Sequence, residues 1–417
     1  MSTFETSAAP LAVSRAASIP PSCLHDVFRS AEVWERTHRR AAIRLHVGEP
    51  AFAPPSEAVE ALGAAARDGR AAYTSAEGMI ELREALAAKL ATENGHHTAP
   101  DRVFVSPGSC QGLAALMQSM ADPGDEILLP EIHWPIHLQQ ALLAGLRPRF
   151  YPLDRDFRPD VDSLADAGGA DTRLILLNTP SNPAGVVLDE PFLRAVLDLA
   201  RRRRWRIISD EAYEHFVFEG THVSMAALER DVPERERLVH SAFSFSKSYA
   251  MTGYRLGYIA VPNERAASAL RVVQEASIVA PPTPVQYAGL AALGAPGAAA
   301  RNRETVRANR DLALPDLVAA GLLGRVPPGG WYALLDLASV GLDADVFAAE
   351  LLAEHGTAVA PGRGFALRPI LDAQCRVTGL GQSPRSHGLL RIAFCGDGEL
   401  LRAGVERLLT TASGGRE

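Results

Sequence analysis

Short apolar runs alternate with amphipathic stretches along most of the chain. Brief apolar runs bounded by turn-forming residues are typical of buried strands, and the clearest are Val103–Val105, Ile127–Leu129, Leu174–Leu177, Ile207–Ile208 and Tyr258–Val261. The first run is followed by Ser106-Pro107-Gly108-Ser109 and then by helical spacing up to Met120. Strands that alternate with helices predict an α/β fold, in which helices cover both faces of a mainly parallel sheet.

The pattern changes near Pro296. A long polar–apolar helix is predicted over Ala300–Ala313, and shorter helix and strand signals follow it. The segment before Pro50 lacks an apolar core of its own, so we expect it to pack on its neighbours. We therefore expect an N-terminal arm and small-domain segment over residues 1–50, a large domain over 51–296 and a C-terminal small domain over 297–417.

Composition narrows the class of protein. The chain has 417 residues, of which 47% are hydrophobic and 22% charged, as expected for a globular protein of enzyme size. A net charge of −7 gives no electrostatic reason to expect nucleic acid or an anionic membrane as partner. The run Arg201–Arg204 follows an amphipathic stretch, and we interpret it as the basic end of a helix.

Cysteine spacing and apolar run length bear on location. The 4 cysteines show no Cys-x-x-Cys spacing, so neither a disulfide framework nor a metal site is indicated. No apolar run approaches membrane-spanning length, and Met1–Ser22 has no apolar core behind a basic start. We therefore expect a cytoplasmic protein.

Lysine is almost absent. The chain has 42 basic residues, and only Lys89 and Lys247 are lysines. Lys89 lies off the apolar stripe of a predicted helix, and we interpret it as a solvated surface residue. Lys247 is a candidate for chemistry that arginine cannot perform, because an amine can lose its proton and attack a carbonyl.

The biological cofactor that uses such an amine most broadly is pyridoxal 5'-phosphate, and the sequence offers a group for each of its parts. Gly108-Ser109-Cys110 at a predicted helix start offers backbone N–H groups for the phosphate, and Arg255 offers a fixed cation. Asp210 follows a predicted strand, where a carboxylate can keep the pyridine nitrogen protonated. The other candidates are Asn182 and Tyr213 for the phenolic oxygen and Trp134 for stacking on the ring.

Three motifs together resemble a known family. They are Asn178-Thr179-Pro180-Ser181-Asn182-Pro183-Ala184-Gly185, Asp210-Glu211-Ala212-Tyr213, and Ser244-Phe245-Ser246-Lys247 followed by Gly253-Tyr254-Arg255-Leu256-Gly257. In order and separation they resemble the class I/II aminotransferases with the aspartate aminotransferase fold, over about Leu45 to Leu408. The resemblance implies the pyridoxal-phosphate-dependent transferase fold type I, with a large domain and a smaller α/β domain that the N-terminal segment and the C-terminal part form together.

The resemblance also implies roles for individual residues. Lys247 would carry the cofactor and shuttle the proton at the substrate Cα, with Asp210 on the pyridine nitrogen. Arg391 would clamp the substrate α-carboxylate, with Gly48 in the substrate-side loop and Asn182 beside it. The remaining cofactor-binding residues would be Asn182 and Tyr213 at the phenolic oxygen, Trp134 on the ring, and Ser109, Cys110, Ser244 and Arg255 at the phosphate. Tyr73 would reach the cofactor of a second subunit, which implies a homodimer.

Departures from the family pattern affect the substrate. His137 stands where many members have tyrosine, and Ala184 where threonine is common, both at the edge of the expected pocket. We interpret His46, His133 and His137 as structural residues and leave them outside the site. No arginine matches the one that aspartate-specific members use for a side-chain carboxylate, so a dicarboxylic substrate is not supported.

We therefore expect amino-group transfer from an amino acid to a 2-oxo acid. The same residues also begin elimination of the C–S lyase kind, cyclisation of a guanidino amino acid, racemisation and oxidase chemistry, because each starts from a carbanion at Cα. The motifs indicate the cofactor and the proton abstraction, and they leave the next step open.

Overall fold

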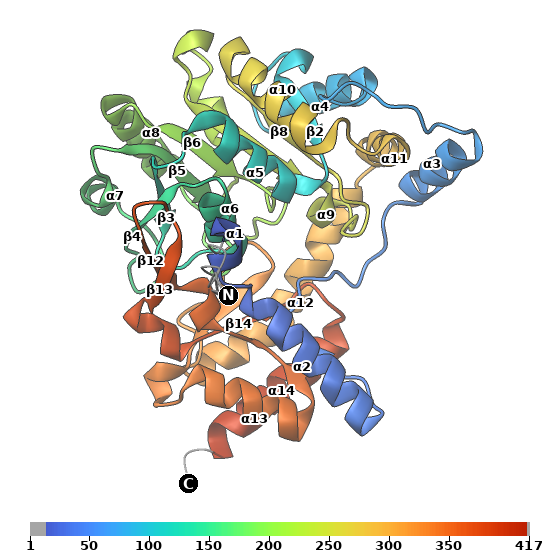
Figure 1. Ribbon diagram of the computed structural model, residues 1–417. Coiled ribbons are helices and arrows are strands. Elements are labelled where there is room, and N and C mark those ends of the chain that lie inside the picture. The colour runs from blue at the N-terminus through green and yellow to red at the C-terminus, as the bar shows by residue number, and fades with distance from the viewer. Residues whose placement is uncertain (1–13, 415–417) are drawn as a thin grey trace, which may run out of the picture.

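A computed structural model describes residues 14–414 of the chain. Its centre is a seven-stranded sheet with the order β2-β8-β7-β6-β5-β3-β4 (Figure 1). The strands are β2 (Val103–Ser106), β3 (Glu126–Pro130), β4 (Arg147–Tyr151), β5 (Thr172–Asn178), β6 (Arg206–Asp210), β7 (Val239–Ser244) and β8 (Gly257–Ala260). All predicted apolar runs are strands of this sheet. Neighbouring strands from β4 to β7 run parallel, and β8 is antiparallel to both β2 and β7.

Helices cover both faces of the sheet, as the sequence predicts. On β3, Ile127 and Leu129 pack with α5 (Gly108–Met120), α6 (Pro135–Leu143) and α10 (Glu264–Ile278), while Leu128 packs on the opposite face with α7 (Val161–Ala167) and α8 (Glu190–Arg203). This alternation follows from the two-residue period of a strand. On that second face, α4 (Ile80–Glu93) and α11 (Thr283–Gly294) cover β2 and β8. The basic run ends α8 as predicted, with Arg204 in the left-handed conformation at its C-cap.

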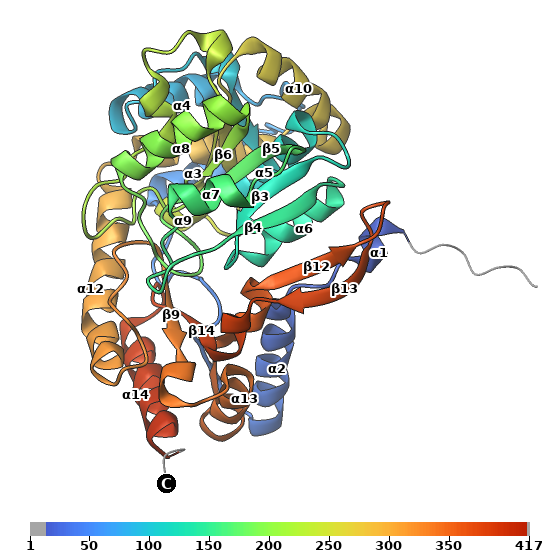
Figure 2. The ribbon, with the colours of Figure 1, turned by 90° about the vertical axis from the view of Figure 1, so that its left-hand side faces the viewer.

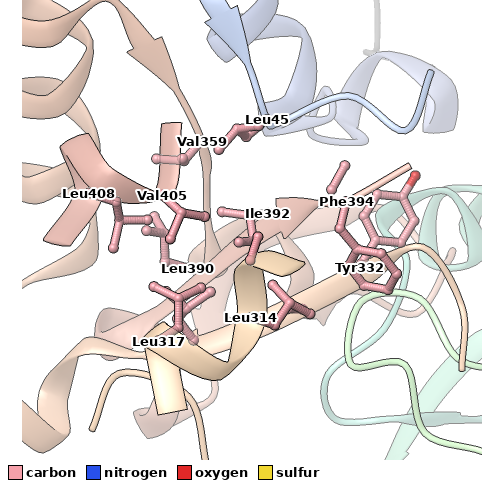
Figure 3. Packing of buried hydrophobic residues seen from close by; sticks show 14 of the residues in the cluster. Leu45, Leu314, Leu317, Tyr332, Val359, Leu390, Ile392, Phe394, Val405 and Leu408 are labelled. Carbon is pink, nitrogen blue, oxygen red and sulfur yellow. The ribbon is translucent and has the colours of Figure 1, made fainter. Parts of the chain in front are cut away.

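The C-terminal part has a core of its own. Strands β9 (Tyr332–Asp336), β11 (Ala360–Pro361) and β14 (Leu389–Ala393) form an antiparallel sheet that packs against α12 (Ala298–Ala319), α13 (Ala344–His355) and α14 (Gly398–Gly414). Leu314 and Leu317 of α12 point toward Ile392 of β14 (Figure 3). The N-terminal segment contributes Leu45 to the same core.

The remaining elements connect these layers. The N-terminal segment contains α1 (Arg15–Ser18), α2 (Cys23–His38) and β1 (Ile43–Arg44), and β1 pairs with β10 (Thr357–Ala358). Helix α3 (Ser56–Arg67) packs against α11. A hairpin of β12 (Leu367–Leu371) and β13 (Val377–Gln382) projects from the small sheet beside α1 (Figure 2). The division at residues 50 and 296 stays a prediction, and residues 1–13 of the N-terminal arm lie outside the described residues.

No helix within residues 14–414 is both long and apolar enough to cross a membrane. All 4 cysteines are free, as their spacing predicts.

Candidate active site

The expected cofactor residues meet where the central parallel strands end. Asn178, Asp210 and Ser244 are the last residues of the neighbouring strands β5, β6 and β7. They border one cavity of about 290 Å³. Its other lining residues are Gly48, Glu49, Ser109, Cys110, Trp134, Asn182, Ala212, Tyr213, Ser246, Lys247, Thr252, Arg255 and Tyr332. Residues separated by up to 284 positions in sequence therefore share a single pocket, at the edge where ligands bind in open α/β sheets.

Asp210 is a buried carboxylate held from two sides. Its Oδ2 lies 2.9 Å from Nε2 of His137, and its Oδ1 accepts a hydrogen bond of 3.2 Å from the backbone N–H of Ala212. Both side chains are almost fully buried. The sequence placed His137 only at the pocket edge and outside the site, and the structure shows that it orients Asp210. Its position three residues after Trp134, on the first turn of α6, is the signal that sequence reasoning undervalued.

Lys247 presents an under-bonded amine to the same cavity. The short helix α9 (Phe245–Ser248) positions it, and Ser244 caps that helix by accepting from the N–H of Ser246 at 3.2 Å. Nζ of Lys247 makes one long hydrogen bond, 3.4 Å to the carbonyl oxygen of Gly48, and lies 4.6 Å from the ring centroid of Trp331. An amine with so few partners is free to react.

The start of α5 and Arg255 together form a cradle for an anion. Gly108 has a φ of 77°, and a Cβ there would lie 2.6 Å from Nη2 of Arg255, so only glycine permits this approach. Arg255 also has a positive φ, and its Nη1 donates to the carbonyl oxygen of Thr252 at 2.7 Å. Ser109 and Cys110 lie in the first helical turn, where backbone N–H groups are unpaired.

Cys110 lines the pocket as a neutral thiol. Burial raises the pKa of this group, and the nearby Arg255 only partly opposes the shift. Nε2 of Gln140 donates to the Cys110 carbonyl at 2.6 Å, which fixes the turn. Backbone donors rather than the thiol therefore make this turn suitable for a phosphate.

Asn182 and Tyr213 stand on loops after β5 and β6. The backbone N–H of Asn182 donates to Oδ1 of Asn178 at 2.7 Å, which fixes the loop. Burial raises the pKa of Tyr213 well above its ordinary value, with a further contribution from Tyr332, so the phenol stays protonated and can donate. Trp134 is the N-cap residue of α6 and meets the His137 ring edge-on at 5.1 Å.

Arg391 is a fixed, buried guanidinium on β14. Nη1 donates to Oδ1 of Asn182 at 3.0 Å, and Nη2 donates to the carbonyl oxygen of His46 at 2.6 Å. The rings of Tyr332 and Phe365 flank it, with centroids 4.1 Å and 4.6 Å from its central carbon. The structure thus brings Arg391 to the pocket through two lining residues, Asn182 and Tyr332. Sequence reasoning missed Tyr332.

Gly48 and Tyr73 differ in how the structure places them. Gly48 lines the pocket, and a Cβ at this position would collide with the hydroxyl group of Tyr332. Tyr73 is 85% exposed and is not among the residues that line the pocket of its own chain. The expected site residues therefore line the pocket of the single chain, apart from Tyr73 and from Arg391, which touches the lining residues Asn182 and Tyr332.

The prediction for Lys89 is wrong. Lys89 is buried, and its Nζ lies 2.6 Å from Oε2 of Glu214 and 2.8 Å from Oδ1 of Asn94. It lies off the apolar stripe of α4, as the sequence indicates, but the loop after β6 covers that side of the helix. A carboxylate 125 positions away supplies the missing partner, and helical periodicity cannot reveal such a contact.

The fold and the pocket together define an α/β protein with an under-bonded lysine amine in a cavity at the ends of its parallel strands, and comparison with known proteins identifies its family. The family model for Aminotransferase class I and II matches residues 40–408. The chain belongs to the class I and II aminotransferases, a family that uses pyridoxal phosphate.

Within this family the chain is aspartate aminotransferase-like. It is 34% identical to an aspartate/prephenate aminotransferase of Thermus thermophilus, over 88% of this chain and 89% of that protein. It is 33% identical to an aspartate aminotransferase of Rhizobium meliloti, over 85% of this chain and 90% of that protein.

Solved structures of aminotransferases also match the fold of this chain. The structure of Thermus thermophilus aspartate aminotransferase with maleate matches with a TM-score of 0.84 at 31% identity, covering 96% of this chain and 99% of that one. An aminotransferase from Mycobacterium tuberculosis matches with a TM-score of 0.85 at 27% identity, covering 97% and 99% of the two chains.

Proposed function

We propose that this chain moves the amino group of an amino acid to a 2-oxo acid in the cytoplasm, with pyridoxal phosphate bound at the pocket described above. One observation carries the proposal: the under-bonded amine of Lys247 and the buried carboxylate of Asp210 line the same cavity. Arg391 contacts that cavity's wall through Asn182. A nucleophile, a carboxylate for a ring nitrogen and a carboxylate clamp are the groups that this reaction needs.

The residues present fit the cofactor. The cradle of Gly108 and Arg255 suits a phosphate, because a helix N-terminus and a guanidinium both favour an anion. Asp210, oriented by His137, suits a protonated pyridine nitrogen. Asn182 and Tyr213 would donate to the phenolic oxygen, Trp134 would stack on the ring, and Ser109, Cys110 and Ser244 would complete the phosphate set. When bound, pyridoxal phosphate supplies an electrophilic carbonyl and a ring that accepts electrons from the substrate Cα.

The protein's own groups then bind the substrate and move protons. Arg391 would hold the substrate α-carboxylate with both terminal nitrogens, at a site already shaped by Tyr332 and Phe365. Lys247 would take the proton from Cα and return it to the neighbouring carbon, because its amine has few competing partners. Asp210 would face the ring nitrogen, held in place by His137 and the backbone of Ala212.

A neutral substrate side chain is favoured. Among the described residues that line the pocket, the cations are Lys247 and Arg255, and both have roles toward the cofactor. Glu49 adds a carboxylate to the same lining, and its Oε1 accepts from the Thr252 hydroxyl at 2.7 Å. Aspartate and prephenate, the substrates named for the Thermus relative, each carry a second carboxylate, which Glu49 would repel.

The second subunit is part of the proposal. Tyr73 is an exposed aromatic residue on the loop before α4, and the hydroxyl of Thr283 anchors that loop by donating to the Ala72 carbonyl at 2.6 Å. We assign Tyr73 to the cofactor phosphate of the neighbouring subunit in a homodimer. Tyr73→Phe should then weaken cofactor retention in the dimer, measured by equilibrium dialysis, while the dimer itself persists in light scattering.

A panel of amino acids tests the reaction. Purified holoenzyme is mixed with each amino acid, and conversion of the cofactor to its aminated form is followed by absorbance, with ammonia and peroxide measured in parallel. Amination without ammonia supports transfer. Ammonia release would indicate elimination, and peroxide would indicate oxidation. L-Asparagine should convert the cofactor faster than L-aspartate, and the reverse order would contradict the preference for a neutral side chain.

A further inference from the structure

A polar cluster with a buried ion pair at its centre lies next to the site, outside the residues assigned above. It consists of Lys89, Glu93 and Asn94 at the end of α4 and Glu214 and His215 after β6. Lys89 and Glu214 are both less than a tenth exposed, and their charged groups are 2.6 Å apart. A buried ion pair of this kind requires well-placed partners, because removing two charges from water is costly.

The cluster gives the ammonium group of Lys89 two short hydrogen bonds and a second nearby carboxylate. Nζ donates to Oε2 of Glu214 at 2.6 Å and to Oδ1 of Asn94 at 2.8 Å, and Oε2 of Glu93 is 3.8 Å away. The Asn94 amide also donates to Glu214 Oε2 at 2.6 Å. Nζ also lies 5.3 Å from the ring centroid of Phe243, on β7. Three compact donors on one nitrogen fit this arrangement, and the planar fork of arginine does not.

The cluster reaches the active site along two short stretches of backbone. Glu214 directly follows Tyr213, so the ion pair fixes the loop that carries this phenol. Nδ1 of His215 lies 2.7 Å from the hydroxyl oxygen of Ser248, and Ser248 directly follows Lys247. His215 also lies 3.1 Å from Oε2 of Glu93, which ties this second contact to the end of α4.

We propose that Lys89 is a positioning residue for the reaction. Through Glu214 it holds the loop that carries Tyr213, and through Glu93 and His215 it holds the helix that carries Lys247, so that the two groups keep their relative positions. Tyr213 and Lys247 stand on different strand ends, β6 and β7. Lys89 contacts Glu214 on the one side and Glu93 on the other, and Glu93 in turn contacts His215. The inference rests on the proposed roles of Tyr213 and Lys247, and it adds a residue that touches neither substrate nor cofactor.

The test compares two buried cations. Lys89→Met removes the cluster's buried cation, and Arg310→Met removes a cation of similar burial on α12, which pairs with Glu219 and Asp311. Lys89→Met loses an ion pair with both partners buried, and Arg310→Met loses a buried cation whose two carboxylate partners are more than half exposed, so both variants lose stability. Only Lys89→Met should loosen the two segments that carry Tyr213 and Lys247.

Backbone hydrogen exchange of the cofactor-free protein is the first readout. In Lys89→Met, peptides covering residues 210–216 and 244–249 should exchange about tenfold faster, while the same peptides in Arg310→Met match the wild type. In holoenzyme, kcat of Lys89→Met should fall about tenfold with KM within about twofold, because misplaced groups act on the chemical step. Lys89→Arg should not restore kcat.

The outcomes separate this inference from the proposed function. If Lys89→Met and Arg310→Met lose the same stability and the two peptides exchange at the wild-type rate in both, Lys89 has no positioning role. If Lys89→Met does not fold, Glu214→Gln, which keeps the shape of the side chain, is measured in its place and should show a smaller change in the same peptides. If wild-type holoenzyme has no bond between Lys247 and the cofactor, the proposed function fails, while the exchange result still decides whether Lys89 holds these segments.

Discussion

The chain's only two lysines occupy opposite kinds of environment. Nζ of Lys89 has two hydrogen bonds shorter than 2.9 Å to side-chain oxygens, whereas Nζ of Lys247 has one of 3.4 Å to a backbone carbonyl. The first amine is neutralised by a buried carboxylate, and the second borders a cavity and lies over the ring of Trp331. A lysine held by strong partners stabilises the fold, and a lysine left without them is available for chemistry.

The largest expected effect is on turnover. Lys247→Ala should lower kcat at least about a thousandfold, because no other described amine lines the pocket to move the proton at Cα. Its free energy of unfolding should change by no more than about 1 kcal/mol, since the side chain loses one long hydrogen bond. Steady-state kinetics and urea denaturation of the cofactor-free protein measure the two quantities. A Lys247→Ala variant that still turned over at a tenth of the wild-type rate would contradict the assignment of the reactive amine to Lys247.

Lys89→Met should affect the stability of the fold more than it affects turnover. Breaking a buried pair leaves Glu214 without its charge partner, so the free energy of unfolding should fall by about 3–5 kcal/mol. The loss in kcat should remain far smaller than that of Lys247→Ala. Urea denaturation checks the first value, with Arg310→Met as control. Stability unchanged within error would show that the pair contributes nothing to the fold.

Lysine should not be able to replace arginine at position 391, where the substrate α-carboxylate is expected to bind. Arg391→Lys keeps a positive charge but loses the planar fork that contacts Asn182 and the His46 carbonyl. KM for the amino acid should rise about tenfold or more, with a smaller change in kcat. Equal KM values in the two proteins would show that the α-carboxylate binds elsewhere.

The smallest effect concerns pH. Burial opposes ionisation of Glu214, but the Lys89 ammonium, His215 and the Asn94 amide outweigh it and hold the pKa at about 2, below the usual 4.5. The stabilisation is therefore complete above about pH 4.5 and is lost as the pH falls toward 2. The difference in unfolding free energy between wild type and Glu214→Gln should narrow over that interval. A difference independent of pH would contradict the ion pair.

Sequence reasoning could predict the parts of the molecule that depend on local pattern. The apolar runs predicted strands of the large sheet, because a short apolar run bounded by turns is typical of a buried strand, and the order and separation of three motifs carried the family resemblance. The antiparallel direction of β8 was not predicted, since an apolar run such as Tyr258–Val261 has no direction. Whether Tyr73 serves a second subunit also stays a prediction.

Contacts between distant segments account for the rest. Lys89 was misread because its partner, Glu214, lies 125 positions away, and helical spacing reports only which face a residue occupies. His137 was left outside the site because a lone histidine has no signature of the aspartate it orients, which lies 73 positions away. Tyr332 was missed for the same reason, because its role depends on Arg391 and Gly48.

The most direct measurement asks which lysine carries the cofactor. Holoenzyme is reduced with borohydride, digested with a protease, and its peptides are mapped by mass spectrometry. The account predicts a reduced adduct on Lys247 and none on Lys89, because only the Lys247 amine borders the pocket. An adduct on Lys89, or an unmodified Lys247 in fully loaded enzyme, would contradict it.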